Sequence, residues 1–204
     1  GLVIYLHAWT LPQEVVSRLE KNKDNCVTAQ AIVGTDVNPL PINRVLTVIE
    51  ALRTLSSIDT ELLDKITTKI LTIKPQDPFI AEGLVVVHGD ASMTNILWHK
   101  DKITALLDFE WVRMGPRDLE LVAILGFMRE QFTNKKEDYD LIIVALKKEY
   151  PELFKSPNLL DRLWLYEAAY GLRQLFLNLP KNYTLATRRL QEIFDGNDNS
   201  DLLM

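Results

Sequence analysis

Three oxygen-bearing side chains stand at the ends of short apolar runs in the middle of the chain. Asp90 and Asn95 follow the run 84–87 and are five residues apart, and Asp108 ends a second run, 103–107. An aspartate can accept the proton of an attacking hydroxyl, while a carboxamide and a second carboxylate supply the hard oxygen ligands that Mg²⁺ prefers beside phosphate groups. A capped turn after a buried strand is the simpler alternative for the first two residues. Because Asp108 completes the pattern, phosphoryl transfer is the favoured interpretation.

The order and spacing of these residues form recognisable motifs. Residues 88–95 read HGDASMTN, with the Asp-to-Asn spacing of the kinase catalytic loop, and DFE at 108–110 stands where kinases carry D-F-G. GPRDLEL follows at 115–121. Together these motifs, which cover residues 84–125, resemble the aminoglycoside phosphotransferase family and its choline-kinase-like relatives. The resemblance implies a protein-kinase-like fold.

The resemblance also implies a role for each residue of the motifs. Asp90 is expected to be the catalytic base, and Asn95 and Asp108 are expected to bind Mg²⁺. Glu110 is expected to assist the metal through water, and His88 to brace the backbone of the loop by hydrogen bonding. The sequence identifies no residues that bind the nucleotide, which is expected to be ATP or GTP.

Two departures from protein kinases indicate the type of acceptor. Gly89 stands where protein kinases carry an arginine that ordinarily pairs with a phosphorylated activation loop, so control by phosphorylation of such a loop is not expected. Asp118 follows Asp108 by only ten residues, which leaves no room for a long activation loop or a protein-substrate platform. Asp118 itself is expected to cap the next helix, because an aspartate there accepts backbone N–H bonds. The expected acceptor is therefore a hydroxyl of a small molecule: an aminoglycoside, a choline-like amine, a sugar or an amino alcohol.

The elements that must position these residues are mostly helical. Apolar residues at three- and four-residue spacing predict helices, and β-branched apolar runs predict strands. Asp59 is expected to cap the second helix of the set. The expected helices cover residues 42–59, 60–73, 118–132, 136–150, 159–179 and 184–194, and the expected strands cover 2–6, 84–88, 95–99 and 103–109. The predicted fold class is α+β, mostly helical: the C-terminal lobe of a protein-kinase-like fold, with a small β-hairpin that carries the catalytic and metal residues.

The expected organisation is a single domain over residues 1–204. Residues 1–43 are interpreted as a hinge or a remnant of the N-terminal lobe, 44–204 as the helical lobe, and 195–204 as a frayed tail. A kinase also needs a Gly-rich loop and a strand lysine, and neither is found before the catalytic loop. The expectation is an incomplete catalytic lobe whose activity in isolation stays open. The alternative is a non-catalytic, pseudokinase-like binding module.

Composition excludes several other classes. The net charge of −5 argues against a general nucleic-acid binder. No apolar run approaches the roughly 18 residues of a membrane span, and the single Cys26 forbids an internal disulfide. We therefore expect no nucleic-acid or membrane partner and a cytoplasmic location. Three scattered histidines make a two-metal phosphoesterase a poor third option.

Two further sets of residues have competing interpretations. Trp98 and Trp111 are expected to pack against the core, although Trp111 directly follows the metal segment and could line a pocket. Glu120, Asp161 and Glu167 could attract a cationic amine, but scattered acids on helices are expected to lie on solvated faces.

Overall fold

A computed structural model describes most of the chain from residue 42 to residue 195. The described residues are 42–54, 58–74, 78, 83–100, 102–131, 136–177 and 183–195. The strand expected at residues 2–6 and the expected tail, 195–204, apart from its first residue, lie outside them. Among the described residues the chain divides into two compact units, one formed by residues within 83–159 and the other by residues within 42–78 and 160–195. No helix of the described part is long and apolar enough to cross a membrane.

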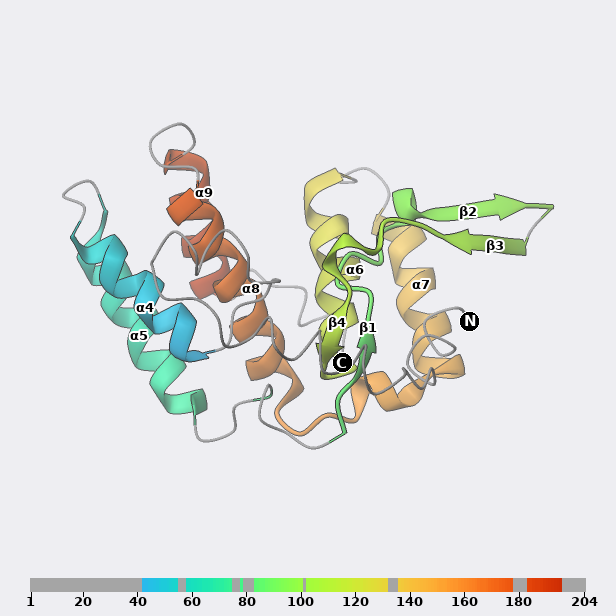
Figure 1. The fold of residues 1–204 in the computed structure, drawn as a ribbon, viewed down its shortest axis with the longest axis horizontal. Helices are drawn as coiled ribbons and strands as arrows, with labels where there is room; N and C mark the ends of the chain where they lie inside the picture. Colours follow the sequence, from blue (N-terminus) through green and yellow to red (C-terminus); the bar gives the residue numbers. More distant parts are fainter. Residues whose placement is uncertain are drawn as a thin grey trace. The chain divides into compact units, whose positions relative to one another are not determined.

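The second unit contains four helices around an apolar core. They are α4 (Ile42–Arg53), α5 (Thr60–Ile73), α8 (Leu159–Leu177) and α9 (Tyr183–Phe194), drawn from blue to red in Figure 1. The expected three- and four-residue spacing places one face of each of α4 and α5 in the core, because these positions share a face of a helix. The core contributed by α4 and α5 consists of Ile42, Val45, Val48, Ile49, Leu52, Leu62, Leu63, Ile66, Ile70 and Ile73, and α8 adds Trp164, Leu165, Ala168, Ala169, Leu172 and Leu175.

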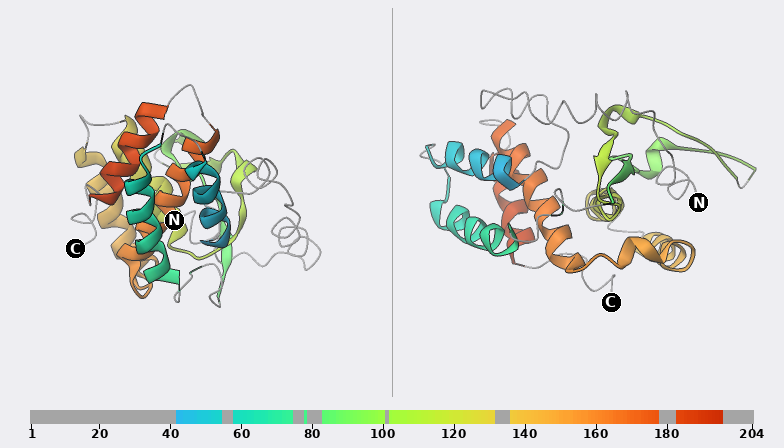
Figure 2. Two further views of the ribbon diagram at one scale, coloured as in Figure 1. Left: turned by 90° about the vertical axis from the view of Figure 1, so that its left-hand side faces the viewer. Right: turned by 60° about the horizontal axis from the view of Figure 1, so that its bottom comes forward.

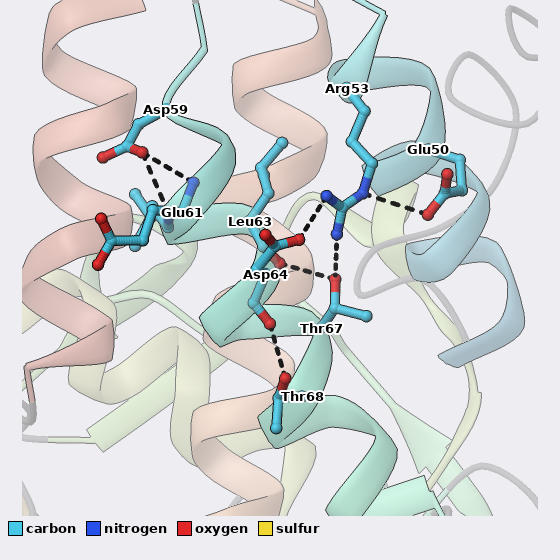
Figure 3. Close-up of polar contacts among 9 residues, drawn as sticks. Glu50, Arg53, Asp59, Glu61, Leu63, Asp64, Thr67 and Thr68 are labelled. Carbon is cyan, nitrogen blue, oxygen red and sulfur yellow. Dashed lines mark hydrogen bonds and ion pairs between the residues drawn. The ribbon is translucent and has the colours of Figure 1, made fainter.

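The cap expected for α5 is confirmed. The carboxylate of Asp59 accepts the backbone N–H groups of Glu61 at 2.9 Å and Leu62 at 3.3 Å. These donors have no partner inside the helix, so the contact satisfies groups that would otherwise need water. Figure 3 shows the cap.

A polar bridge joins the exposed sides of α4 and α5 (Figure 3). Arg53 donates to the carboxylate of Asp64 at 2.5 Å and to the hydroxyl of Thr67 at 3.3 Å, and it also pairs with Glu50 at 3.3 Å. Asp64 and Glu50 are well exposed to solvent. Because exposed ion pairs contribute little, packing of the apolar faces, rather than this bridge, holds the two helices together.

The first unit contains two small antiparallel sheets and two helices. β1 (Val85–Val87) pairs with β4 (Arg113–Gly115), and β2 (Ile96–His99) forms a hairpin with β3 (Lys102–Leu106). The helices α6 (Leu119–Gln131) and α7 (Lys136–Glu149) follow, and 3-10 turns occur at Met93–Asn95, Phe109–Trp111 and Pro151–Phe154. The hairpin predicted from the sequence is confirmed, whereas β4 was not predicted. Figure 2 shows the two strand pairs from two further sides.

The expectation that Trp98 packs against the core is wrong. Its side chain is 54% exposed on β2, and Leu97 beside it is also exposed. The register of β2 against β3 shifts between these two residues, and none of β2 is fully buried. Trp111 is half-buried in the turn that follows Asp108.

Candidate functional site

Asp90 and Asn95 face each other across a tight loop after β1. The side-chain amide of Asn95 donates to both the backbone oxygen of Asp90, at 2.9 Å, and its carboxylate Oδ2, at 3.0 Å. Two backbone bonds close the loop, from Ser92 N–H to the Asp90 carbonyl at 2.7 Å and from Asn95 N–H to the Ser92 carbonyl at 3.0 Å. The five-residue spacing therefore gives one turn whose ends are joined through a side chain. This arrangement holds one carboxylate oxygen of Asp90 and leaves the other available.

His88 connects this loop to the end of β3. Its Nδ1 accepts the backbone N–H of Asp90 at 3.3 Å, and its Nε2 lies 2.9 Å from the carbonyl oxygen of Leu107. Since a carbonyl only accepts and an amide N–H only donates, these partners fit an imidazole that carries a proton on Nε2 and accepts at Nδ1. The buried ring also lies against Phe109, with ring centroids 4.8 Å apart. The imidazole thus links the segment of Asp90 to the segment of Asp108.

Asp108 directly follows the residue that ties β3 to Asn95. The backbone N–H of Leu107 donates to the Asn95 carbonyl at 2.8 Å, so the last ladder bond of the hairpin lies next to Asp108. The Asp108 backbone is left-handed, with φ +61° and ψ +69°, and its exposed carboxylate makes no capping bond to the following turn. Aspartate tolerates this conformation better than most residues. The backbone turn therefore ends the strand and leaves the carboxylate on the surface.

Gly89 is required by the close approach of the turn that contains Trp111. Its φ is +79°, and a Cβ added there would lie 2.6 Å from the backbone oxygen of Trp111. Both the left-handed backbone and the contact exclude a side chain. The residue that replaces the protein-kinase arginine is thus a point where the loop of Asp90 meets the turn after Asp108.

The environment of Asp90 changes its acidity. Burial raises the pKa of the Asp90 carboxyl above its ordinary value, and the hydrogen bond from Asn95 opposes this in part. The electrostatic interaction with His88 also lowers this pKa, whereas the negative charges of Asp108 and Glu120 act to raise it. A carboxylate with a raised pKa is a stronger base than a free one, which suits proton acceptance.

The side chains that could hold a divalent cation here are oxygen donors only. The amide nitrogen of Asn95 is committed to Asp90, so its Oδ1 is the atom that could contact a metal, and the exposed carboxylate of Asp108 could supply a second oxygen. Within the described ranges no group of three or more His, Cys, Asp or Glu residues could hold a metal ion. Mg²⁺ keeps several waters and needs one or two carboxylates plus substrate phosphates. The donor set therefore fits Mg²⁺ bound together with a nucleotide, and not a metal held by the protein alone.

The structure places the remaining expected residues as follows. Asp118 is fully buried directly before α6, where its carboxylate accepts the hydroxyl of Ser156 at 3.1 Å. Its backbone oxygen accepts the N–H of Leu121 at 3.1 Å; the expected side-chain cap stays a prediction. The side chain of Glu110 lies outside the described residues.

Sequence reasoning missed one contact of the loop, the one made by Glu120. This side chain is fully buried, and its Oε1 accepts the backbone N–H of His88, 32 residues earlier. The expectation of a solvated face is wrong for Glu120 and for Glu167, which is also buried, while Asp161 is exposed. The sequence gives one indication that Glu120 is buried: it lies between two leucines, Leu119 and Leu121, which are themselves buried.

Comparison with known families identifies the chain at this point. The family model of the phosphotransferase enzyme family, APH, matches residues 41–150, which include the whole loop, the hairpin and α6. The chain belongs to this family. The comparison with curated proteins finds no match.

Solved structures of aminoglycoside phosphotransferases share the fold. The apo form of a thermostable mutant of APH(4)-Ia is 18% identical with a TM-score of 0.53, over 94% of this chain and 69% of that one. APH(2'')-Ib bound to ADP is 13% identical with a TM-score of 0.51, over 94% of this chain and 59% of that one. A ternary complex of mutant APH(4)-Ia with AMP-PNP and hygromycin B is 17% identical with a TM-score of 0.53, over 92% and 67% of the two chains. The chain thus spans about three fifths to two thirds of these relatives.

Proposed function

We propose that the chain is the catalytic, C-terminal lobe of a small-molecule kinase, which transfers a phosphoryl group from a nucleoside triphosphate to a hydroxyl. The observation that carries the proposal is the pair of bonds from the Asn95 amide to the backbone and carboxylate of Asp90. This contact orients both side chains, one for the acceptor and one for the metal. Membership of the phosphotransferase enzyme family supports it.

In the proposed reaction Asp90 acts on the acceptor hydroxyl. One carboxylate oxygen is held by Asn95, so the other accepts the hydroxyl proton as the oxygen attacks the terminal phosphorus. The bond from phosphorus to the bridging oxygen breaks, and the nucleoside diphosphate leaves. General-base catalysis of this kind contributes about 10²–10⁴-fold in rate, and most of the remainder comes from positioning and charge stabilisation.

Asn95 Oδ1 and Asp108 would hold the metal in this proposal. When bound, Mg²⁺ neutralises charge on the phosphate oxygens of the nucleotide. The left-handed backbone of Asp108 and the bond from Leu107 to Asn95 keep the two donors at the base of the same hairpin. Because the solved relatives include complexes with ADP and AMP-PNP, ATP is the favoured donor over GTP.

A small molecule, not a protein, is the proposed acceptor. The residues between Asp108 and α6 are occupied by a 3-10 turn and by β4, which pairs with β1. No stretch within 109–118 is left to form a platform for a polypeptide. A cationic amine alcohol or an aminoglycoside is a proposed class, since one solved relative was crystallised with hygromycin B.

The first test measures metal and nucleotide binding to the protein by calorimetry. We expect ATP to bind in the presence of Mg²⁺ and much more weakly when Mg²⁺ is chelated, and Asp108→Ala to remove the difference. Asp64→Asn, an exposed carboxylate on α5, serves as a control that should behave like the wild type. Binding that ignores both Mg²⁺ and Asp108 would contradict the proposed site.

The second test is a screen of hydroxyl acceptors for phosphate transfer. Asp90→Asn should lower kcat by about 10²–10⁴-fold and leave the affinity for Mg²⁺ and ATP largely unchanged. A protein that binds the nucleotide but phosphorylates no acceptor would instead support the alternative, a pseudokinase-like binding module.

A further inference from the structure

Glu120 is a charged side chain that is fully buried. It lies in the first turn of α6, and its neighbours Leu119 and Leu121 are buried with it. Burying a carboxylate is costly unless it is hydrogen-bonded, although the first turn of a helix is a favourable place for negative charge. The carboxylate accepts the backbone N–H of His88. A bond from an amide to a carboxylate is stronger than one between neutral groups.

His88 is the residue through which this contact reaches the catalytic loop. Its backbone N–H is held by Glu120, its Nδ1 holds the N–H of Asp90, and its Nε2–H is donated to Leu107 beside Asp108. The hydrogen-bonded route from Glu120 to the loop therefore passes through the backbone and ring of His88, in addition to the electrostatic effect of its negative charge on Asp90.

We propose that Glu120 is a positioning residue that anchors the catalytic loop to α6. By fixing the backbone of His88, Glu120 fixes the position of the imidazole. One nitrogen of this ring contacts the backbone of Asp90, and the other contacts the residue that follows β3. The inference rests on the proposed kinase function for its kinetic consequence, but the contact itself can be tested without activity.

The direct test is NMR of the His88 backbone amide. In the wild type this amide should resonate downfield and exchange slowly with solvent, because a carboxylate accepts it. Glu120→Ala should move it upfield and speed its exchange. Glu120→Gln keeps an acceptor oxygen of nearly the same shape and should restore most of the protection. An unchanged His88 amide in Glu120→Ala overturns the inference.

The kinetic test separates positioning from general stability. Removal of a residue that holds a functional side chain in position commonly lowers activity by about 10–100-fold. We therefore expect Glu120→Ala to lower kcat by that factor, while KM for ATP changes less than about threefold. Glu120→Gln should recover most of the loss. Leu121→Ala, a cavity at the adjacent buried position, is the matched control: it should lower stability and leave kcat and the His88 amide unchanged below the melting temperature.

The outcomes distinguish this inference from the proposed function. If the wild-type protein phosphorylates no acceptor, the proposed function is refuted. The NMR measurement of the His88 amide then still tests its hydrogen bond to Glu120. An active wild type with full kcat in Glu120→Ala overturns the inference alone. Equal kcat losses in Glu120→Ala and Leu121→Ala would also overturn it, because they would indicate loosening of α6 and not the hydrogen bond.

Discussion

Replacement of Gly89 by alanine tests how tightly the catalytic loop is packed against the turn after Asp108. Gly83 supplies a matched control, because both glycines are left-handed, with φ +79° at Gly89 and +81° at Gly83. A Cβ at Gly89 would lie 2.6 Å from the backbone oxygen and 3.1 Å from the Cβ of Trp111, whereas no heavy atom of the described residues lies within 4 Å of one at Gly83. The two substitutions share the backbone cost and differ in the contact.

The expected magnitudes follow from these two terms. A left-handed backbone costs a residue with a Cβ about 1–2 kcal/mol, and the smaller entropy of the unfolded alanine chain offsets about 0.4–1 kcal/mol. Gly83→Ala should therefore lower the free energy of unfolding by about 1 kcal/mol. Overpacking against a backbone atom adds about 1–3 kcal/mol, so Gly89→Ala should lower it by about 2–4 kcal/mol.

Urea denaturation of both variants measures the difference. The midpoint should fall further for Gly89→Ala, with little change in the slope against denaturant. The reasoning is refuted if Gly89→Ala costs no more than Gly83→Ala within about 0.5 kcal/mol, a margin comparable to the additivity error for independent sites. Equal costs would mean that the loop moves away from Trp111 without resistance.

Three further predictions concern stability. The folded state raises the pKa of Asp90 above its unfolded value. The stability contributed by this group is therefore present at low pH and is lost as the pH rises from the unfolded pKa through the folded pKa. Asp90→Asn should raise the melting temperature at pH 7, and this gain should shrink in acid. A lower melting temperature for this variant at pH 7 would contradict the burial argument. Asp59→Ala should cost about 1 kcal/mol in urea denaturation because it removes the cap of α5, whereas Asp64→Ala should cost less than about 1 kcal/mol because its ion pair is exposed; equal losses would count against the cap. Leu63→Ala, at a fully buried position of the helical core, should cost about 2–5 kcal/mol by the same measurement, and a loss below 1 kcal/mol would argue against a packed core.

Local patterns predicted much of the helical structure. The helices expected at 60–73 and 136–150 match α5 and α7 closely, and α4 begins where expected and ends earlier, at Arg53. Such helices follow from apolar spacing and capping residues that are adjacent in the chain. The hairpin of β2 and β3 was predictable for the same reason, since its two strands are joined by a short connection.

Contacts between distant segments escaped this reasoning. β4 is three residues long and pairs with β1 from 28 residues away, and so short a strand has no periodicity to detect. The burial of Glu120 and the exposure of Trp98 were both contrary to expectation, because the environment of a side chain depends on which segment packs over it.

The sequence by itself determined the chemistry available to the protein: an Asp and an Asn five residues apart, with an Asp at the end of the next strand pair. Their types and order do not depend on how the rest of the chain folds. Only the tertiary structure decided how the pieces are held, through His88 between the two segments, Gly89 against Trp111, and α6 supplying a carboxylate to the loop. The physical reason is that hydrogen bonds and close packing between segments distant in sequence require folded geometry, which spacing along the chain does not encode.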